Sequence, residues 1–296
     1  MLNFLLVLLT NLDTINTTFD SYEIKNLTST GYDIYIYGVR SPGGVERVQF
    51  PTWTIYGGQD DLDYSWSTSS FSAGTNLGNG TWKYHVNVAN HNNESGQYIT
   101  HVYICGNDDC KLVIWYIQPV IQTADYVGSL YLADADANFN NDKYYPLSSN
   151  SINSNFTYEF DAKPETTIPI YSNGTYAVTT ANTHNFIIQD SYGGTGEYAG
   201  IGLSIGTNGA VAIAHAAAYY YVLLNYSGDL SSQHRYRFTV KNNIPYLYID
   251  GNLMASGISP ISPVTILFTN NVIGNGIYGS YKGWANNFVI YNTARQ

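Results

Sequence analysis

Apolar and polar residues alternate in short segments along most of the chain, a pattern that predicts β-strands. Between residues 31 and 119, turn residues such as Pro42-Gly43-Gly44 separate these segments. Short strands at regular spacing within about 90 residues are typical of an immunoglobulin-like (Ig-like) β-sandwich. The strands expected here are 32–39, 45–53, 81–88, 97–105 and 111–117.

Residues 125–296 contain more strands and no helical periodicity. The stretch AVAIAHAAAYYYVLL is rich in alanine, but its tyrosine and valine residues favour two strands over one helix. Many short strands of this kind predict a jelly roll of two packed sheets. The strands expected here are 129–132, 155–162, 186–190, 200–205, 210–215, 219–225, 234–241, 246–249, 265–268 and 286–291.

The chain begins with the apolar run MLNFLLVLLT, whose leucines recur at helical spacing. A membrane-spanning helix needs about 20 apolar residues, and no basic residue precedes Lys25 to form the n-region of a signal peptide. We therefore expect residues 1–30 to form a separate docking segment, extended from residue 11 onwards, with a cleaved signal peptide as the alternative. The docking side chains would be Leu2, Phe4, Leu5, Leu6 and Leu9.

Composition agrees with an all-β fold and restricts the partners. Charged residues make up 11% of the 296 residues, while tyrosine occurs 29 times. Tyrosine favours strands. The formal net charge is −10, with 12 lysines and arginines. Because nucleic acids and anionic membrane surfaces attract clustered cations, both are disfavoured as partners.

The two cysteines, Cys105 and Cys110, bracket the polar turn CGNDDC. Two cysteines exclude a disulfide scaffold and a self-contained zinc site. They can join the two sides of a hairpin or remain reduced thiols, and the sequence leaves these alternatives open.

A set of spaced motifs lies between residues 45 and 103. In order, they are VERVQFPTW, GQDDL, Trp66, NGTWKYHV and HNNESGQYITHVY. In this arrangement the segment 31–119 resembles the Bsp-like repeat of Gram-positive cell-wall proteins and phage lysins. The resemblance implies an Ig-like, non-catalytic module associated with cell walls, in which His91 and His101 are structural. It implies no defined ligand.

A second resemblance covers most of residues 125–296. Its motifs are GIGLSIGTNGAVAIAHAAAYYYVLLNYSGDL, HRYRFTVKNNIPYLYIDGNLMASG and YGSYKGWANNFVIYNTA. They resemble the laminin-G-like, concanavalin-type jelly roll of bacteria and phages, and YLYIDGNL matches its hairpin. Asn286 and Asn287 stand where the closing strand of that family carries an acidic pair. Jelly rolls of this class host lectins, glucanases and adhesive modules, so the fold alone does not choose among them.

Carbohydrate binding is the chemistry that exposed aromatic residues on such a jelly roll favour. Aromatic faces stack on the C–H surfaces of sugars, and polar side chains bond their hydroxyl groups. A core position is the competing interpretation for each tyrosine and for the histidine. The candidate residues are Tyr192, Tyr198, Tyr219, Tyr221 and His215.

Calcium is the one metal that the sequence suggests, because its ligands are oxygen atoms. The run ADADANFNND offers Asp134, Asp136 and Asp142 as ligands. It lacks the spacing of an EF-hand, and an aspartate- and asparagine-rich turn is the competing interpretation. No cofactor is required.

No catalytic residues are predicted. Glycoside hydrolysis needs two carboxyl groups that flank a cleft, and the nearest candidates are Glu159 and Asp161, which share one face of an expected strand. A solvated strand face is the competing interpretation. The one G-x-S-x-G run, at residues 202–206, lies in the expected strand 200–205, so it does not form the strand-to-helix elbow of a serine hydrolase.

The leading hypothesis is a non-enzymatic phage virion protein, such as a capsid decoration, head fibre or tail adhesin. Its N-terminal segment would bind capsid or tail proteins, and its lectin-like domain would bind a host cell-wall or surface glycan at the virion surface. A secreted bacterial surface adhesin is the alternative, and a polysaccharide or cell-wall hydrolase is the second. Homo-oligomerisation is left open.

Overall fold

The computed structural model divides the chain into two compact units, Met1–Thr123 and Ala124–Gln296. Among the described residues, the regular elements are β-strands and one short 3₁₀-helix, which confirms the all-β fold. No described helix has the length and apolar character that crossing a membrane requires. The predicted docking side chains at positions 2–9 lie outside the described residues. The residues that the structure describes are 16–55, 59, 61–106, 109–133, 135–140, 143, 145–146, 154–178, 180, 182–189, 198–216, 219–261, 264–266, 272–274 and 278–296.

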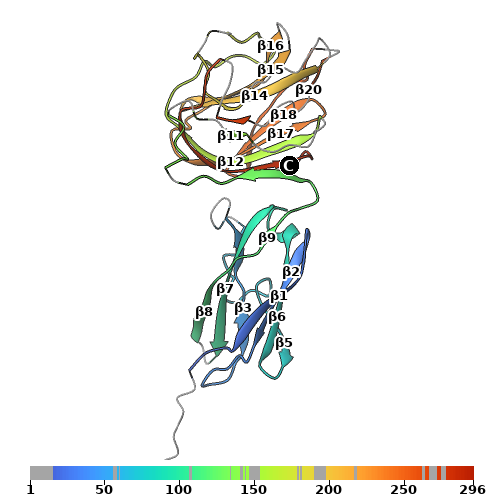
Figure 1. Ribbon diagram of the computed structural model, residues 1–296, viewed down its shortest axis with the longest axis vertical. Coiled ribbons are helices and arrows are strands. Elements are labelled where there is room, and N and C mark those ends of the chain that lie inside the picture. The colour runs from blue at the N-terminus through green and yellow to red at the C-terminus, as the bar shows by residue number, and fades with distance from the viewer. Residues whose placement is uncertain are drawn as a thin grey trace, which may run out of the picture. The chain divides into compact units, whose positions relative to one another are not determined.

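The first unit is an Ig-like sandwich of two antiparallel sheets (Figure 1). One sheet has the order β1-β2-β6-β5, and in the other β7 pairs with β3, β4, β8 and β9. Apolar side chains of β2 and β7 alternate into a shared core, as the sequence pattern predicts. The elements are β1 (Ser21–Thr28), β2 (Gly31–Tyr37), β3 (Arg47–Gln49), β4 (Thr52–Thr54), β5 (Thr75–Gly78), β6 (Thr81–Asn87), η1 (Val88–Asn90), β7 (Gly96–Gly106), β8 (Asp109–Ile117) and β9 (Val120–Ile121).

Strand β1 lies in the stretch that the sequence assigned to the separate N-terminal segment. It pairs with β2 in antiparallel register, so that Ile24 lies opposite Ile34. Ile24 is the one apolar side chain of β1 that packs against the core, while most of the strand is exposed. A polar edge strand carries little alternation, which is why the sequence pattern showed an extended segment and not a sheet strand.

Cys105 on β7 and Cys110 on β8 form a disulfide across paired positions of the two strands. We expect the double variant Cys105→Ser/Cys110→Ser to unfold with a free energy about 2 kcal/mol lower, because the bond closes a short loop in the unfolded chain. Urea unfolding of the two proteins measures this difference. Equal unfolding free energies would contradict it.

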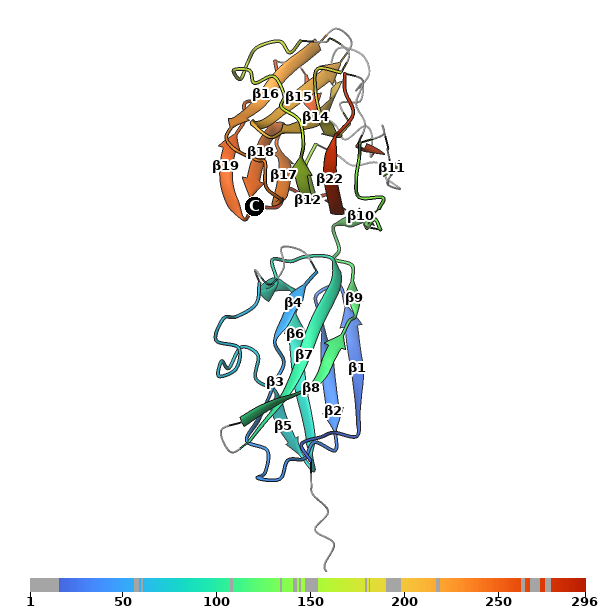
Figure 2. The same cartoon turned by 90° about the vertical axis from the view of Figure 1, so that its left-hand side faces the viewer.

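The second unit is a jelly roll with one six-stranded and one seven-stranded sheet (Figure 2). The six-stranded sheet has the order β10-β22-β12-β17-β18-β19. The other runs β11-β21-β13-β14-β15-β16, with β20 paired to β14. The strands are β10 (Tyr126–Leu130), β11 (Tyr145–Pro146), β12 (Phe156–Pro164), β13 (Phe186–Ile188), β14 (Tyr198–Gly206), β15 (Gly209–Ala216), β16 (Tyr219–Ser227), β17 (His234–Lys241), β18 (Ile244–Ile249), β19 (Asn252–Ser256), β20 (Thr265–Ile266), β21 (Val272–Ile273) and β22 (Gly283–Tyr291).

The alanine-rich stretch forms the two neighbouring strands β15 and β16, as the sequence predicts. Along β15, Ala210, Ala212 and Ala214 face the core between the sheets. Val211 and Ile213 point the other way, into a smaller apolar cluster with Ile168, Phe186 and Val222. The segment that follows β12 therefore covers the outer face of the seven-stranded sheet.

Candidate functional site

A polar pocket opens in the second unit, where three chain segments meet beside this outer face. Its volume is about 100 Å³. The segments precede β13, precede β22 and follow β12, so strand pairing brings together residues that are far apart in the sequence. The polar pocket is lined by Thr166, Thr167, Asn182, Thr183, His184, Asn185, Gly279, Ser280 and Lys282.

The buried side chain of Asn185 holds these segments together. Its Oδ1 accepts the backbone N–H of Lys282 at 2.6 Å, and its Nδ2 donates to the backbone carbonyl of Ile205 at 2.6 Å. Its own backbone N–H donates to Oγ of Ser204 at 2.9 Å. The backbone N–H of Thr207 also donates to the carbonyl of Thr166 at 2.8 Å. One amide side chain therefore fixes the spacing between the pocket walls.

Gly279 allows the segments before β13 and β22 to approach closely. Its φ of +148° lies in a region that residues with side chains rarely adopt, and a Cβ there would lie 1.8 Å from the carbonyl oxygen of His184. The backbone N–H of His184 donates to the carbonyl of Tyr278, and that of Phe186 donates to Gly279. A glycine is thus required at this wall of the polar pocket.

His184 is the one titratable lining residue with a buried side chain; it is 5% exposed. Its Nε2 lies 3.0 Å from the carbonyl oxygen of Val178, which requires a proton on Nε2. Burial lowers the pKa of the imidazole, and the bond to Val178 opposes that effect. The ring is therefore neutral at neutral pH, with Nδ1 as an acceptor that has no hydrogen-bond partner among the described residues.

The lowered pKa of His184 predicts a loss of stability on acidification. The unfolded histidine, with a pKa near 6.5, binds more protons than the folded one as the pH falls below that value, so the free energy of unfolding decreases. Urea unfolding at about pH 7 and at about pH 5 measures this effect. Between these two pH values, we expect the free energy of unfolding to decrease less in His184→Gln than in the wild-type chain. An identical loss in both proteins would contradict the assignment.

The chemistry of the pocket lining is that of a site for an uncharged or anionic polar group. Thr166, Thr167, Thr183 and Ser280 bring hydroxyl groups, Asn182 brings an amide and Lys282 brings the cation. None of the nine lining residues that the structure describes is acidic. In a chain of net charge −10, such a lining favours ligands that carry hydroxyl or other acceptor oxygens.

The sequence-predicted sugar residues whose side chains are described, Tyr198, Tyr221 and His215, do not line the polar pocket. Tyr198 is 45% exposed, at the start of β14. Tyr221 is partly buried and meets the exposed Tyr176 edge-on, with ring centroids 5.4 Å apart. His215 is 3% exposed and lies beside Tyr220. The backbone of Tyr219 belongs to β16, and nothing is described of its side chain or of Tyr192.

The predicted calcium residues are described only in part. Asp136 is exposed, and its carboxylate lies 3.8 Å from Nζ of Lys143. Asp134 and Asp142 lie outside the described residues. Within the described part of the chain, no group of three or more histidine, cysteine, aspartate or glutamate residues is placed to hold a metal ion.

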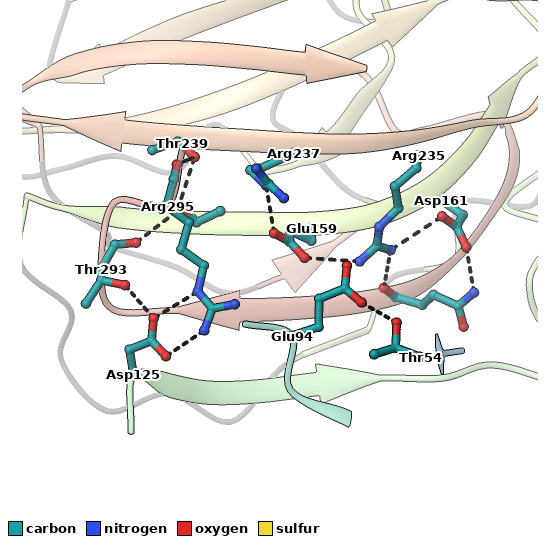
Figure 3. Close-up of polar contacts among 12 residues, drawn as sticks. Thr54, Glu94, Asp125, Glu159, Asp161, Arg235, Arg237, Thr239, Thr293 and Arg295 are labelled. Carbon is teal, nitrogen blue, oxygen red and sulfur yellow. Dashed lines mark hydrogen bonds and ion pairs between the residues drawn. The ribbon is translucent and has the colours of Figure 1, made fainter. Parts of the chain in front are cut away.

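The carboxylates considered for hydrolysis belong to an ion-pair network on the six-stranded sheet (Figure 3). Oε1 of Glu159 accepts a hydrogen bond from Nε of Arg237 at 2.8 Å, and Oε2 lies 3.3 Å from Nη2 of Arg235. Oδ2 of Asp161 accepts a hydrogen bond from Nδ2 of Asn287 at 2.6 Å, and Oδ1 lies 3.4 Å from Nη1 of Arg235. Neither acid lines the polar pocket, and both are buried.

The sequence pattern does not indicate the residues of the polar pocket. The weak signals were the polar run Asn182–Asn185 directly before the buried strand β13, and Lys282 directly before β22. Polar residues before a strand are ordinary turn residues, so the pattern gave no reason to select them. Their convergence follows from strand order, which the pattern does not specify.

Comparisons with known proteins found a family match within the first unit and low-identity matches among solved structures. Residues 21–116 match the family model of the GBS Bsp-like repeat, so the match begins at β1. This confirms the resemblance expected for the first unit. No curated protein matches the sequence significantly.

Among solved structures, the binding domain of botulinum neurotoxin DC in complex with SialylT is 14% identical, with a TM-score of 0.36. The match covers 52% of this chain and 37% of that one, which is well under two thirds of its length. Domain 4 of AbnA, an arabinanase from Geobacillus stearothermophilus, is 15% identical (85% and 96% coverage, TM-score 0.33). Domains LG4-5 of the mouse laminin alpha1 chain are 11% identical (95% and 83% coverage, TM-score 0.32). These likenesses concern the β-sandwich fold alone.

Proposed function

We propose that this protein is a non-enzymatic glycan-binding protein whose second unit binds part of a sugar residue in the polar pocket. The observation that carries the proposal is the lining itself, whose described residues combine hydroxyl groups, an amide and one lysine and include no acidic residue. Sugar hydroxyl groups both donate and accept hydrogen bonds. Lys282 is a donor for an acceptor oxygen of such a ligand, and the threonine and serine hydroxyl groups can act as donors or acceptors.

Preorganisation of the pocket supports binding by so small a site. The bonds of Asn185 and the close approach at Gly279 fix the walls before a ligand arrives. Rigid walls reduce the entropy lost on binding, so more of the interaction energy contributes to affinity. A pocket of this volume holds part of one sugar residue, which predicts weak affinity per site.

Binding without turnover is the activity that the carboxylate network supports. Hydrolysis needs a pair of acids beside the bound sugar. Glu159 and Asp161 instead receive hydrogen bonds from Arg237, Arg235 and Asn287. We propose that the protein needs no cofactor, so removal of calcium with a chelator leaves glycan binding unchanged.

As the setting, we propose the surface of a phage virion, where many copies would convert weak sites into high avidity. The match of the first unit to the GBS Bsp-like repeat supports a setting at bacterial surfaces. A secreted bacterial adhesin is the alternative. Immunogold labelling of native material distinguishes them: label on capsids or tails supports the virion, and label on cell walls or in the medium supports the secreted form.

A charge-matched pair of variants tests the polar pocket. Lys282→Ala removes the exposed cation of the lining, while Lys163→Ala removes an exposed cation from β12 outside it. On an array of peptidoglycan fragments, teichoic acids and capsular polysaccharides, we expect Lys282→Ala to lose at least about tenfold in affinity, as removal of a charge-assisted hydrogen bond does. Lys163→Ala should bind as the wild-type chain does. Equal binding by all three proteins, or no binding by any, would refute the proposal.

A further inference from the structure

The first unit carries a separate cluster of aromatic side chains on the outer face of its β7 sheet. Ring centroids of Trp53 on β4 and His101 on β7 are 4.7 Å apart. Those of Trp115 and Tyr116 on β8 lie 5.8 and 5.5 Å from His101. All three contacts are edge-to-face, a favourable geometry for aromatic pairs. We refer to Trp53, His101, Trp115 and Tyr116 as the aromatic face.

An irregularity in strand pairing produces this cluster. Val102 pairs with Ile114 and Thr100 with Ile117, so two residues of β8 stand opposite His101 alone. Regular alternation would send only one of Trp115 and Tyr116 outward, whereas a bulge re-aims the extra side chain. Ile114 and Ile117 on either side remain in the core.

The side chains of the aromatic face differ in their exposure to solvent. Trp53 is 8% exposed, whereas Trp115 is 63% and Tyr116 is 55% exposed. Burial lowers the pKa of His101, so the imidazole is neutral at neutral pH. The four side chains therefore carry no formal charge, in a protein whose net charge is −10.

We propose that the aromatic face is a second carbohydrate-binding site, which stacks a neutral sugar ring on Trp115 and Tyr116. The negative face of an aromatic ring attracts the polarised C–H groups on one side of a sugar ring. An uncharged ligand suits a face that offers no ion-pair partner.

The size of the aromatic face decides between a sugar and a protein partner. Two fully covered aromatic side chains contribute about 300–500 Å². Each partner in a standard protein interface contributes about 800 Å². The exposed rings thus match one or two sugar units and fall short of a stable protein interface.

This site is independent of the polar pocket, because its residues belong to the other unit. Two weak sites in one chain increase the avidity for a long polysaccharide that reaches both. Loss of one site should leave the intrinsic affinity of the other unchanged.

Affinity electrophoresis of the full chain in gels that contain dextran, mannan or a soluble β-glucan tests the proposal. We expect at least one of these neutral polysaccharides to retard the wild-type chain, and Trp115→Ala to bind it at least about tenfold more weakly, as loss of a stacked ring does. Trp115→Phe should retain part of the retardation. Tyr22→Ala, which removes an exposed tyrosine from β1, should bind as the wild-type chain does.

Thermal unfolding checks that Trp115→Ala is folded, and Tyr116→Ala serves as a second test if it is not. The proposal is overturned if no neutral polysaccharide retards the chain, or if Trp115→Ala and Tyr116→Ala are retarded as strongly as the wild type. It is also overturned if the variants lose only self-association, which would indicate a protein interface. Lys282→Ala should remain retarded, so failure of the polar pocket and failure of the aromatic face are distinguishable.

Discussion

Replacement of Asn185 by alanine is expected to lower the free energy of unfolding of the second unit by about 3 kcal/mol and to abolish glycan binding at the polar pocket. The side chain is 2% exposed and bonds backbone groups of Ile205 and Lys282. Its loss leaves these groups without their partner, and each buried group left unsatisfied costs about 1–3 kcal/mol. The segment before β22 is then free to move away from β13, which opens the pocket.

Urea unfolding measures the stability, and the glycan array described above measures the binding. Asn173→Ala is the matched control, because Asn173 is exposed and lies outside the pocket. Its stability should stay within about 0.5 kcal/mol of the wild type. If Asn185→Ala is as stable and binds as well as this control, Asn185 does not hold the pocket together.

The second large effect is expected from Glu159→Gln. The glutamate is 1% exposed and accepts hydrogen bonds from Nε of Arg237 and Nη2 of Arg235. Glutamine keeps the shape but removes the carboxylate that faces Arg237 and Arg235, although Arg235 retains its ion pair with Asp161. Breaking a buried ion pair costs about 3–5 kcal/mol, and because both arginines keep partial access to solvent, we expect a loss of about 3 kcal/mol.

The same variant separates a structural network from a catalytic one. We expect neither the wild-type chain nor Glu159→Gln to release sugars from a cell-wall polysaccharide, as measured by a reducing-end assay. Glu165→Gln, at an exposed position of the same unit, should change the unfolding free energy by less than about 0.5 kcal/mol. Sugar release by the wild type that Glu159→Gln abolishes would make this residue catalytic.

The alternation of apolar and polar residues predicted most of the fold, because it indicates which side chains of a strand face a core. It placed β15 and β16 in the alanine-rich stretch, and β2, β6, β7 and β8 in the first unit. It merged β3 and β4 into one strand and missed β5. It did not place β1, where only Ile24 reaches the core. It also did not decide whether Cys105 and Cys110 form a disulfide, because that bond depends on the register of the two strands and not on the separation of the cysteines in the chain.

The candidate site was much harder to predict, because its parts have ordinary local sequences. Lys282 and Asn185 are separated by nearly 100 residues, and a partly buried hydrogen bond joins the backbone N–H of Lys282 to the side chain of Asn185. Periodicity also does not show whether an outward-facing side chain is covered. His215 faces away from the main core but is buried beside Tyr220, whereas Trp115 and Tyr116 are exposed through a bulge that alternation does not reveal.

Backbone amide chemical-shift mapping of the full chain with a glycan from the array tests the central claim most directly. The polar pocket predicts that the largest shifts fall on residues 166–167, 182–185 and 279–282, which line it together. Lys282→Ala should reduce these shifts at the same glycan concentration. Shifts that occur only on the first unit, or on the second unit away from these three segments, would contradict glycan binding in the polar pocket.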